Sequence, residues 1–167
     1  NNDDPTFGNV IEAYDAAGGM LARTELVFGM LCAAENTPEL QALQERAMPL
    51  LAAHYDRILL DERLFARVKE LYDRRGALDL DDVQLRLLEK TYRRFVRAGA
   101  LLDAGRKARL KEINGELALA AVKFGNNLLA ENNRFEMELT ADEMAGLPSD
   151  VQELAREKAR ERGKKKD

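Results

Sequence analysis

The stretch from Leu50 to Tyr72 constrains the fold most, because its apolar residues recur at the three- and four-residue steps of one helix face. Before Asp61 the repeat includes Leu51, His54 and Ile58. After Asp61 it continues through Leu64, Phe65, Val68, Leu71 and Tyr72. Because aspartate is a favoured N-cap residue, we predict that one helix ends near Asp61 and a second begins there.

The same periodicity runs through most of the chain and predicts an all-α fold, built as an antiparallel helical bundle. Strong helix formers dominate, tryptophan is absent, and only four of the 167 residues are proline. We expect a first helix from Pro5, with Asp4 as its cap and a bend at Gly18–Gly19. Thr37 and Pro38 should open the helix that contains His54.

Two later helices are predicted to form an antiparallel hairpin. Asp81, with Gln84 three residues later, has the pattern of a capping box, and a longer helix should cover residues 106–132. The link around residues 103–105 is short, which favours antiparallel neighbours. The residues of the longer helix expected to face inward are Leu110, Ile113, Leu117, Ala121, Phe124 and Leu128.

A short β-strand is predicted near the C-terminal end, over residues 134–140. Phe135, Met137 and Leu139 alternate there with Glu136 and Glu138, which is the period-two pattern of a strand. One strand is not stable alone, so it needs a partner from elsewhere. A last helix capped by a serine and a glutamine should follow, at Ser149 and Gln152. Without a long linker, we expect one domain over residues 1–167.

The chain offers few groups for catalysis or metal binding. His54 is the only histidine and Cys32 the only cysteine, whereas zinc sites use three or four nitrogen, sulfur or carboxylate ligands. We therefore predict no catalytic, cofactor-binding or metal-ligating residue within this chain. His54 is interpreted either as a structural residue at a helix–helix contact or as part of a channel wall. Cys32 is expected to be inert packing.

Composition excludes several classes of protein. A net charge of −4 argues against a dedicated nucleic-acid module, and one cysteine excludes an internal disulfide framework. We expect no membrane span, because no apolar run approaches the ~20 residues that a bilayer requires. The compartment stays open between the cytoplasm and the periplasm.

Five segments in order resemble one family of peptidases. They are PTFGNVIEA (5–13), LAAHYDRILLDERLFARVKELYDRR (51–75), LEKTYRRFVRAGALL (88–102), INGELALAAVKFGNNLLAENN (113–133) and MAGLPSDV (144–151). This order is similar to the N-terminal half of the bacterial peptidyl-dipeptidases, also called dipeptidyl carboxypeptidases. These enzymes are thimet-oligopeptidase-like zinc metallopeptidases. The resemblance covers most of the chain and predicts a fragment of a longer, mostly helical enzyme of two halves.

The resemblance implies a parent enzyme that uses zinc to release dipeptides from the C-termini of oligopeptides. Its zinc site is an H-E-x-x-H helix, which this chain lacks, since Tyr-Asp-Arg-Ile follows His54. The chain would form a wall and lid of the substrate channel, and its partners would be the C-terminal catalytic half and oligopeptide substrates. Two alternatives stay open: a general oligopeptidase of the same family, or a free-standing α-helical module that binds a partner protein.

Overall fold

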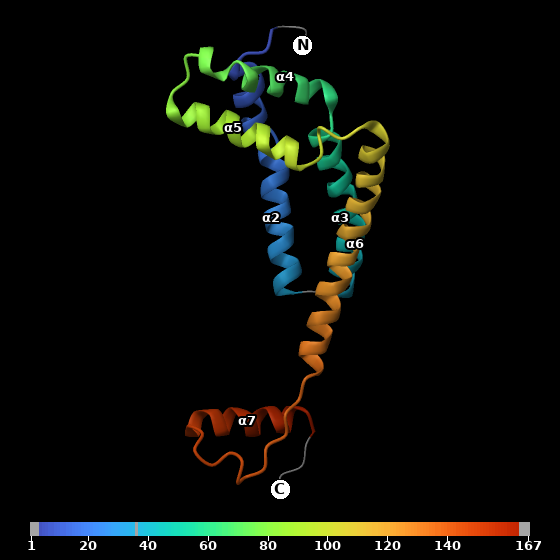
Figure 1. Cartoon of the computed structure of the whole chain (residues 1–167). Helices are drawn as coiled ribbons and strands as arrows, with labels where there is room; N and C mark the ends of the chain where they lie inside the picture. Colours follow the sequence, from blue (N-terminus) through green and yellow to red (C-terminus); the bar gives the residue numbers. More distant parts are fainter. Residues whose placement is uncertain (1–3, 36, 164–167) are drawn as a thin grey trace. The chain divides into compact units, whose positions relative to one another are not determined.

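A computed structural model describes residues 4–35 and 37–163, and every secondary-structure element in those ranges is helical (Figure 1). The predicted all-α class is confirmed. The elements are a π-helical turn η1 (Phe7–Glu12), α1 (Ala13–Ala16), α2 (Gly19–Ala34), α3 (Pro38–Leu59), α4 (Glu62–Asp73), the 3-10 turn η2 (Arg75–Ala77), α5 (Asp82–Arg97), α6 (Ala104–Arg134) and α7 (Ser149–Glu161).

The chain forms two compact units, Asn1–Asn127 and Leu128–Asp167, and the boundary falls within α6. Most of the helices, and the hydrophobic core found among the described residues, belong to the first unit. The second unit contains the end of α6, α7 and the segment between them. A single domain over 1–167 stays a prediction.

Three helix starts follow the local chemistry of the sequence. The Thr37 hydroxyl accepts a hydrogen bond from the Leu40 amide at 3.3 Å, where Pro38 opens α3. The Asp61 carboxylate accepts one from Leu64 at 2.7 Å and separates α3 from α4. Asp81 and Gln84 form the predicted capping box at the start of α5. These side chains satisfy amides that the first helical turn leaves without partners.

The N-terminal helix begins two residues later than predicted. Thr6, not Asp4, is the N-cap, and it forms a capping box with Asn9: Thr6 Oγ1 accepts from the Asn9 amide at 3.1 Å, and Asn9 Oδ1 accepts from the Thr6 amide at 2.9 Å. The Asn9 amide group also donates to the Asp4 carbonyl at 2.9 Å. The predicted interruption near Gly18 is confirmed, since its φ of 81° separates α1 from α2.

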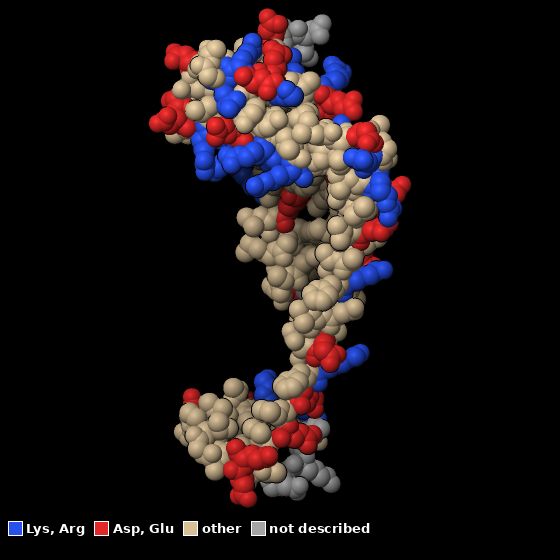
Figure 2. All heavy atoms as spheres, viewed as in Figure 1, with Lys and Arg blue, Asp and Glu red and all other residues tan. Residues whose placement is uncertain are grey.

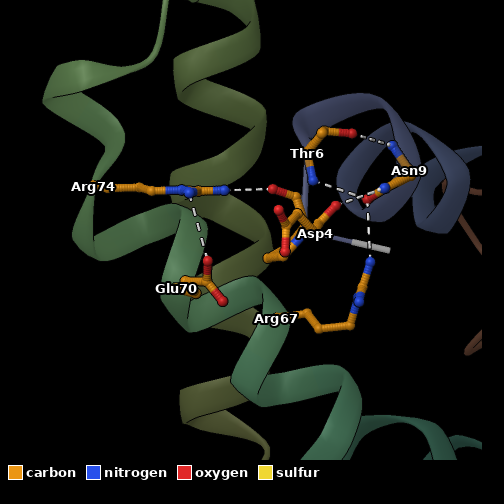
Figure 3. Close-up of polar contacts among 7 residues, drawn as sticks. Asp4, Thr6, Asn9, Arg67, Glu70 and Arg74 are labelled. Carbon is orange, nitrogen blue, oxygen red and sulfur yellow. Dashed lines mark hydrogen bonds and ion pairs between the residues drawn. The ribbon is translucent and has the colours of Figure 1, made fainter. Parts of the chain in front are cut away.

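Two arginines of the α4 region hold the N-terminal segment in place (Figure 3). Arg74 donates to the carbonyl oxygen of Pro5, and Arg67 donates to Asn9 Oδ1 at 3.3 Å. Arg74 is itself oriented by Glu70, 3.5 Å away. These contacts link residues 58 and 69 positions apart, so they position η1 on α4.

The hydrophobic core lies where η1, α4 and α5 pack together, and we call this the N-terminal core. Its largest fully buried side chains are Ile11, Val68, Leu71, Leu88 and Phe95. The inward stripe predicted for α4 is confirmed, because Phe65, Val68 and Leu71 are all buried. Aromatic rings extend the core, with Tyr72 and Tyr92 stacked at its edge.

Helices α5 and α6 do not form the predicted hairpin. The chain turns at Gly99, whose φ of 97° favours glycine, and a Cβ built there would lie 2.7 Å from the Leu110 side chain. After this turn α6 leaves α5 and runs beside α3 (Figure 1). Asn114 of α6 donates to the Asp56 carboxylate of α3 at 2.7 Å. Short links favour antiparallel packing, but the positive φ of Gly99 and these tertiary contacts direct α6 elsewhere.

The strand predicted over residues 134–140 is wrong. Arg134 ends α6, and residues 135–140 have no regular secondary structure. Their alternating pattern has no ladder partner, because none of the described residues forms a strand. The start of α7 also differs from the prediction: its N-cap is Pro148, and Gln152 donates to the Leu147 carbonyl at 2.9 Å.

Candidate functional site

The first unit contains a hollow of about 480 Å³ between α2, α3 and α6. We call it the interhelical hollow. On the α6 side the lining side chains are small, and on the α3 side most of them are longer. The residues that line it are Glu25, Gln44, Met48, Leu51, Ala52, Tyr55, Ala118, Ala121 and Val122.

A carboxylate and a phenol meet at the interhelical hollow. The Tyr55 hydroxyl donates to Glu25 Oε2 at 2.7 Å, which joins α3 to α2. This hydrogen bond raises the pKa of Tyr55, because ionisation would remove the donor and place two negative charges side by side. The second oxygen, Glu25 Oε1, is buried and accepts no hydrogen bond from the described residues. One oxygen of a residue that lines the hollow is therefore a desolvated acceptor.

A second buried polar contact ties α6 to α3. Asp56 is 9% exposed, and its carboxylate accepts the 2.7 Å hydrogen bond from Asn114. A buried carboxylate without such a donor is costly, so the pair fixes how α6 lies on α3. Lys107, also buried, adds an ion pair at 3.0 Å to Glu62 at the start of α4.

Five basic side chains line a second hollow, of about 370 Å³, along α5. Figure 2 shows these Lys and Arg side chains gathered over α5. We call this surface the basic face of α5, and it consists of Arg86, Lys90, Arg93, Arg94 and Arg97. All five are exposed, as expected for residues opposite the buried stripe of this helix.

His54 lies in α3, next to the tyrosine of the interhelical hollow. Its side chain is half-buried, and the centroid of its ring is 5.6 Å from that of Tyr55 in an edge-to-face contact. A structural role and a place in a channel wall both stay predictions for His54. Cys32 is buried in α2 as a free thiol.

Pairs of carboxylates can act in acid–base catalysis, but Asp81 and Glu136 have structural partners. Asp81 caps α5, and Glu136 forms an ion pair with Arg162 at 2.6 Å. Across residues 4–35 and 37–163, no group of three or more His, Cys, Asp and Glu side chains is placed to hold a metal ion. These residues do not fit a catalytic zinc, which needs three protein ligands and an open position.

The N-terminal helical stretch is more apolar than predicted. By length and composition alone, Phe7–Ala34 meets the criterion for a membrane span, because it contains an 18-residue window with a mean hydropathy of 1.2. The prediction that no apolar run approaches this length is therefore wrong. Signal sequences and core helices of soluble proteins pass the same test, so the stretch is weak evidence for a membrane. Only 6% of its apolar window is buried, and Met20 is 85% exposed.

No family model matches this chain. Among curated proteins, the dipeptidyl carboxypeptidases of Salmonella typhimurium and Escherichia coli are each 39% identical to it over 160 residues. Each alignment covers 95% of this chain and 24% of the relative. The oligopeptidase A of Salmonella typhimurium is 25% identical over 155 residues, which cover 92% of this chain and 23% of that protein.

These alignments confirm the resemblance to the dipeptidyl carboxypeptidases. The chain is homologous to the N-terminal quarter of dipeptidyl carboxypeptidase. It spans about a quarter of the length of the curated relatives it matches.

Sequence reasoning missed the polar pairs of α3. Tyr55 and Asp56 are adjacent, and they bind Glu25 and Asn114 respectively, 30 and 58 residues away. A hydrophobic pattern assigns such residues to helix faces but does not pair them. The five cations of α5 were visible in the sequence, but helix periodicity does not show that they surround a hollow.

Proposed function

We propose that this chain is the N-terminal part of a zinc-dependent peptidyl-dipeptidase that releases dipeptides from the C-termini of oligopeptides. The observation that carries the proposal is the 39% identity to two dipeptidyl carboxypeptidases over 95% of the chain. The chain would supply part of the wall and lid of the substrate channel. It would exclude folded proteins from the channel without taking part in bond cleavage.

The catalytic groups of the proposed enzyme belong to the portion that this chain does not cover. A zinc-bound water needs a metal with an open coordination position and a nearby general base. His54 is the chain's only histidine, and its neighbour Tyr55 is hydrogen-bonded to Glu25. The chain would therefore shape the substrate channel and contact the rest of the enzyme, and would not take part in the chemical step. Its principal partner is the catalytic remainder of the same protein.

Exposed apolar surface supports such a partner. On α2 the side chains of Met20, Leu26, Val27 and Met30 are all more exposed than buried. A helix that is apolar on all sides is normally covered on all sides, either by protein or by lipid. The relatives are about four times longer than this chain. In a protein of that length, the part that this chain lacks would be large enough to cover the apolar side chains of α2.

Two alternatives predict other results. A general oligopeptidase would cut peptides internally, but the relatives with that name are 25% identical, compared with 39% for the dipeptidyl carboxypeptidases. A free-standing interaction module would bind a helix of another protein, and the exposed apolar surface of α2 suits that role too. Homology along 160 residues favours the peptidase.

A chimeric enzyme tests the proposal. The segment of the Salmonella typhimurium dipeptidyl carboxypeptidase that aligns with this chain is replaced by the chain, and a variant that lacks the segment is the control. Mass spectrometry then follows the products from a nonapeptide and from its C-terminally amidated form. We expect zinc-dependent release of dipeptides from the free C-terminus by the chimera and no release by the control. A folded, zinc-loaded chimera that is inactive, or that cuts both peptides internally, would contradict the proposal.

A further inference from the structure

We propose that the basic face of α5 binds an acidic peptide segment in an extended conformation. The inference rests on the proposed function for its biological role, in which it names the class of peptide that the channel favours. The binding itself requires only this chain. The argument depends on the spacing of the cations, their lack of acidic partners and the shape of the surface.

The spacing of the cations matches several carboxylates in a row. Arg86, Lys90, Arg93 and Arg97 follow one another at steps of four, three and four residues, which places them along one side of α5. Eleven residues of α-helix extend over roughly 16 Å. An extended peptide covers the same length with about five residues, at roughly 3.3 Å each. The row of cations is longer than a single carboxylate can contact, but its length matches a peptide segment with several acidic side chains.

These cations lack the acidic partners that are common on the other helices. Lys69 pairs with Asp73, and Arg109 lies 2.8 Å from Glu112. On the basic face the ion pair that the structure shows is a long one, 3.8 Å, from Arg93 to Glu89. Among the described residues, no ion pair neutralises Arg86, Lys90 or Arg97.

Helix electrostatics account for only part of this arrangement. Arg94 and Arg97 lie in the last turn of α5, where cations interact favourably with the helix dipole. Lys90 lies about one turn before Arg94 and Arg86 about two turns before it, where that effect has decayed. Like charges in one row repel one another, and this chain has an overall charge of −4. A ligand with several negative charges would relieve the repulsion.

The surface is also shaped and oriented for carboxylates. The five side chains line a hollow, and concave surfaces lined by one sign of charge concentrate the field of their charges. Arg94 lies over the ring of Tyr14, 5.9 Å from its centroid, which limits the positions of its guanidinium group. Arginine binds carboxylates through two parallel hydrogen bonds, and four of the five residues are arginines.

Peptide is a better candidate than nucleic acid. Single-stranded nucleic acids bind where aromatic side chains in a basic groove stack on the bases. The residues lining this hollow are all Lys or Arg. The proposed peptidase function also brings peptides, not nucleic acids, to this part of the chain.

Fluorescence anisotropy of labelled peptides tests the inference directly. The probe is a fluorescein-labelled hexapeptide of alternating glutamate and serine, and its counterpart has glutamine in place of glutamate. We expect the chain to bind the glutamate peptide at least tenfold more tightly, with an affinity that falls as salt increases. Equal affinities for the two peptides would overturn the inference, as would tighter binding of a thymidine oligonucleotide of equal charge.

A pair of matched variants locates the site. R86Q/K90Q/R97Q removes three exposed cations from α5, and R106Q/R109Q/K111Q removes three from α6. We expect the first variant to lose at least tenfold in affinity for the glutamate peptide and the second to stay within twofold. Equal losses would overturn the inference, since net charge alone would then explain binding. Circular dichroism melting curves identify any loss that is due to unfolding.

The chimeric enzyme keeps this inference distinct from the proposed function. Dipeptide release from an uncharged peptide reports the proposed function without involving the basic face. If the chimera releases dipeptides but the chain does not bind the glutamate peptide in preference to the glutamine peptide, this inference alone is overturned. Peptide binding that depends on Arg86, Lys90 and Arg97, without release by the chimera, would support this inference and contradict the peptidase assignment.

Discussion

The N-terminal core and the helix α2 belong to the same compact unit but differ in how their apolar residues are used. In the core, Phe95, Leu88 and Val68 are fully buried among η1, α4 and α5. On α2, Met20 and Met30 are largely exposed, although α2 is at least as apolar as the helices that build the core. The core buries its own apolar residues within the chain, whereas α2 leaves many of its apolar side chains exposed. The proposed function assigns this exposed surface to the rest of a larger enzyme.

The far part of α6 behaves like α2. Leu117 and Phe124 lie on the stripe predicted to face inward, yet they are 60% and 69% exposed. Val122 is buried instead, because α6 turns that side toward the interhelical hollow. Apolar residues on more than one side of a helix are expected where it is buried on more than one side. We therefore group α6 near Phe124 with α2 as the uncovered surface.

The largest expected difference in stability comes from truncating one phenylalanine in each of the two regions. Phe95→Ala should lower the free energy of unfolding by about 3–5 kcal/mol, because it opens a cavity in a closed core. Phe124→Ala should change it by less than about 0.5 kcal/mol, since the ring is already in water. Urea denaturation followed by circular dichroism measures both. Similar costs for the two variants would mean that the regions do not differ as described.

A smaller effect is expected where α6 attaches to α3. Asn114→Ala removes the hydrogen-bond donor of the buried Asp56 carboxylate and should cost roughly 1–3 kcal/mol of stability. Asn127→Ala, at an exposed position of the same helix, is the matched control and should be close to neutral. If both variants have the urea midpoint of the parent chain, the polar pair does not hold α6 in place.

A variant of His54 tests the packing in the middle of α3, between the N-terminal core and the uncovered surface. His54→Ala should cost about 1 kcal/mol, because the half-buried ring loses its edge-to-face contact with Tyr55. Urea titration again gives the value. A loss in that range supports the structural role. An unchanged midpoint would favour the channel-wall interpretation, in which the ring contacts substrate or the remainder of the protein.

The smallest expected effect is a pH dependence at the α2–α3 contact. The hydrogen bond to Glu25 raises the pKa of Tyr55 in the folded chain above its ordinary value of 10.0. The folded state then holds this proton more tightly, so the stabilisation is complete below about pH 10 and is lost as the pH rises through the folded-state pKa. Urea midpoints should fall less between pH 9 and pH 11 for Tyr55→Phe than for the parent chain. Identical pH profiles would show that the hydrogen bond does not form in solution.

Local signals in the sequence predicted local structure well. Thr37, Asp61 and the pair Asp81–Gln84 cap the helices they were expected to cap, because capping depends on residues within one turn. The α4 stripe is buried as its spacing predicts. Gly18 separates two helices because its φ is positive, a conformation that is costly for other residues.

Features that depend on distant partners were predicted less well. The alternation of Phe135 to Leu139 indicates a strand, but a strand forms only when another strand supplies its hydrogen bonds. The path of α6 depends on Gly99 and on the contact between Asn114 and Asp56, and helix periodicity identifies neither. The same limit applies to the candidate site, where Glu25 and Tyr55 meet from separate helices.

Amide hydrogen exchange of α2 tests most directly whether its apolar surface is made to be covered by the rest of a larger enzyme. The chain is measured alone and then with the part of the Salmonella typhimurium dipeptidyl carboxypeptidase that it does not match. We predict that exchange slows markedly across Gly19–Ala34, while the already protected α4 changes little. Exchange in α2 that is the same with and without this partner would contradict the account.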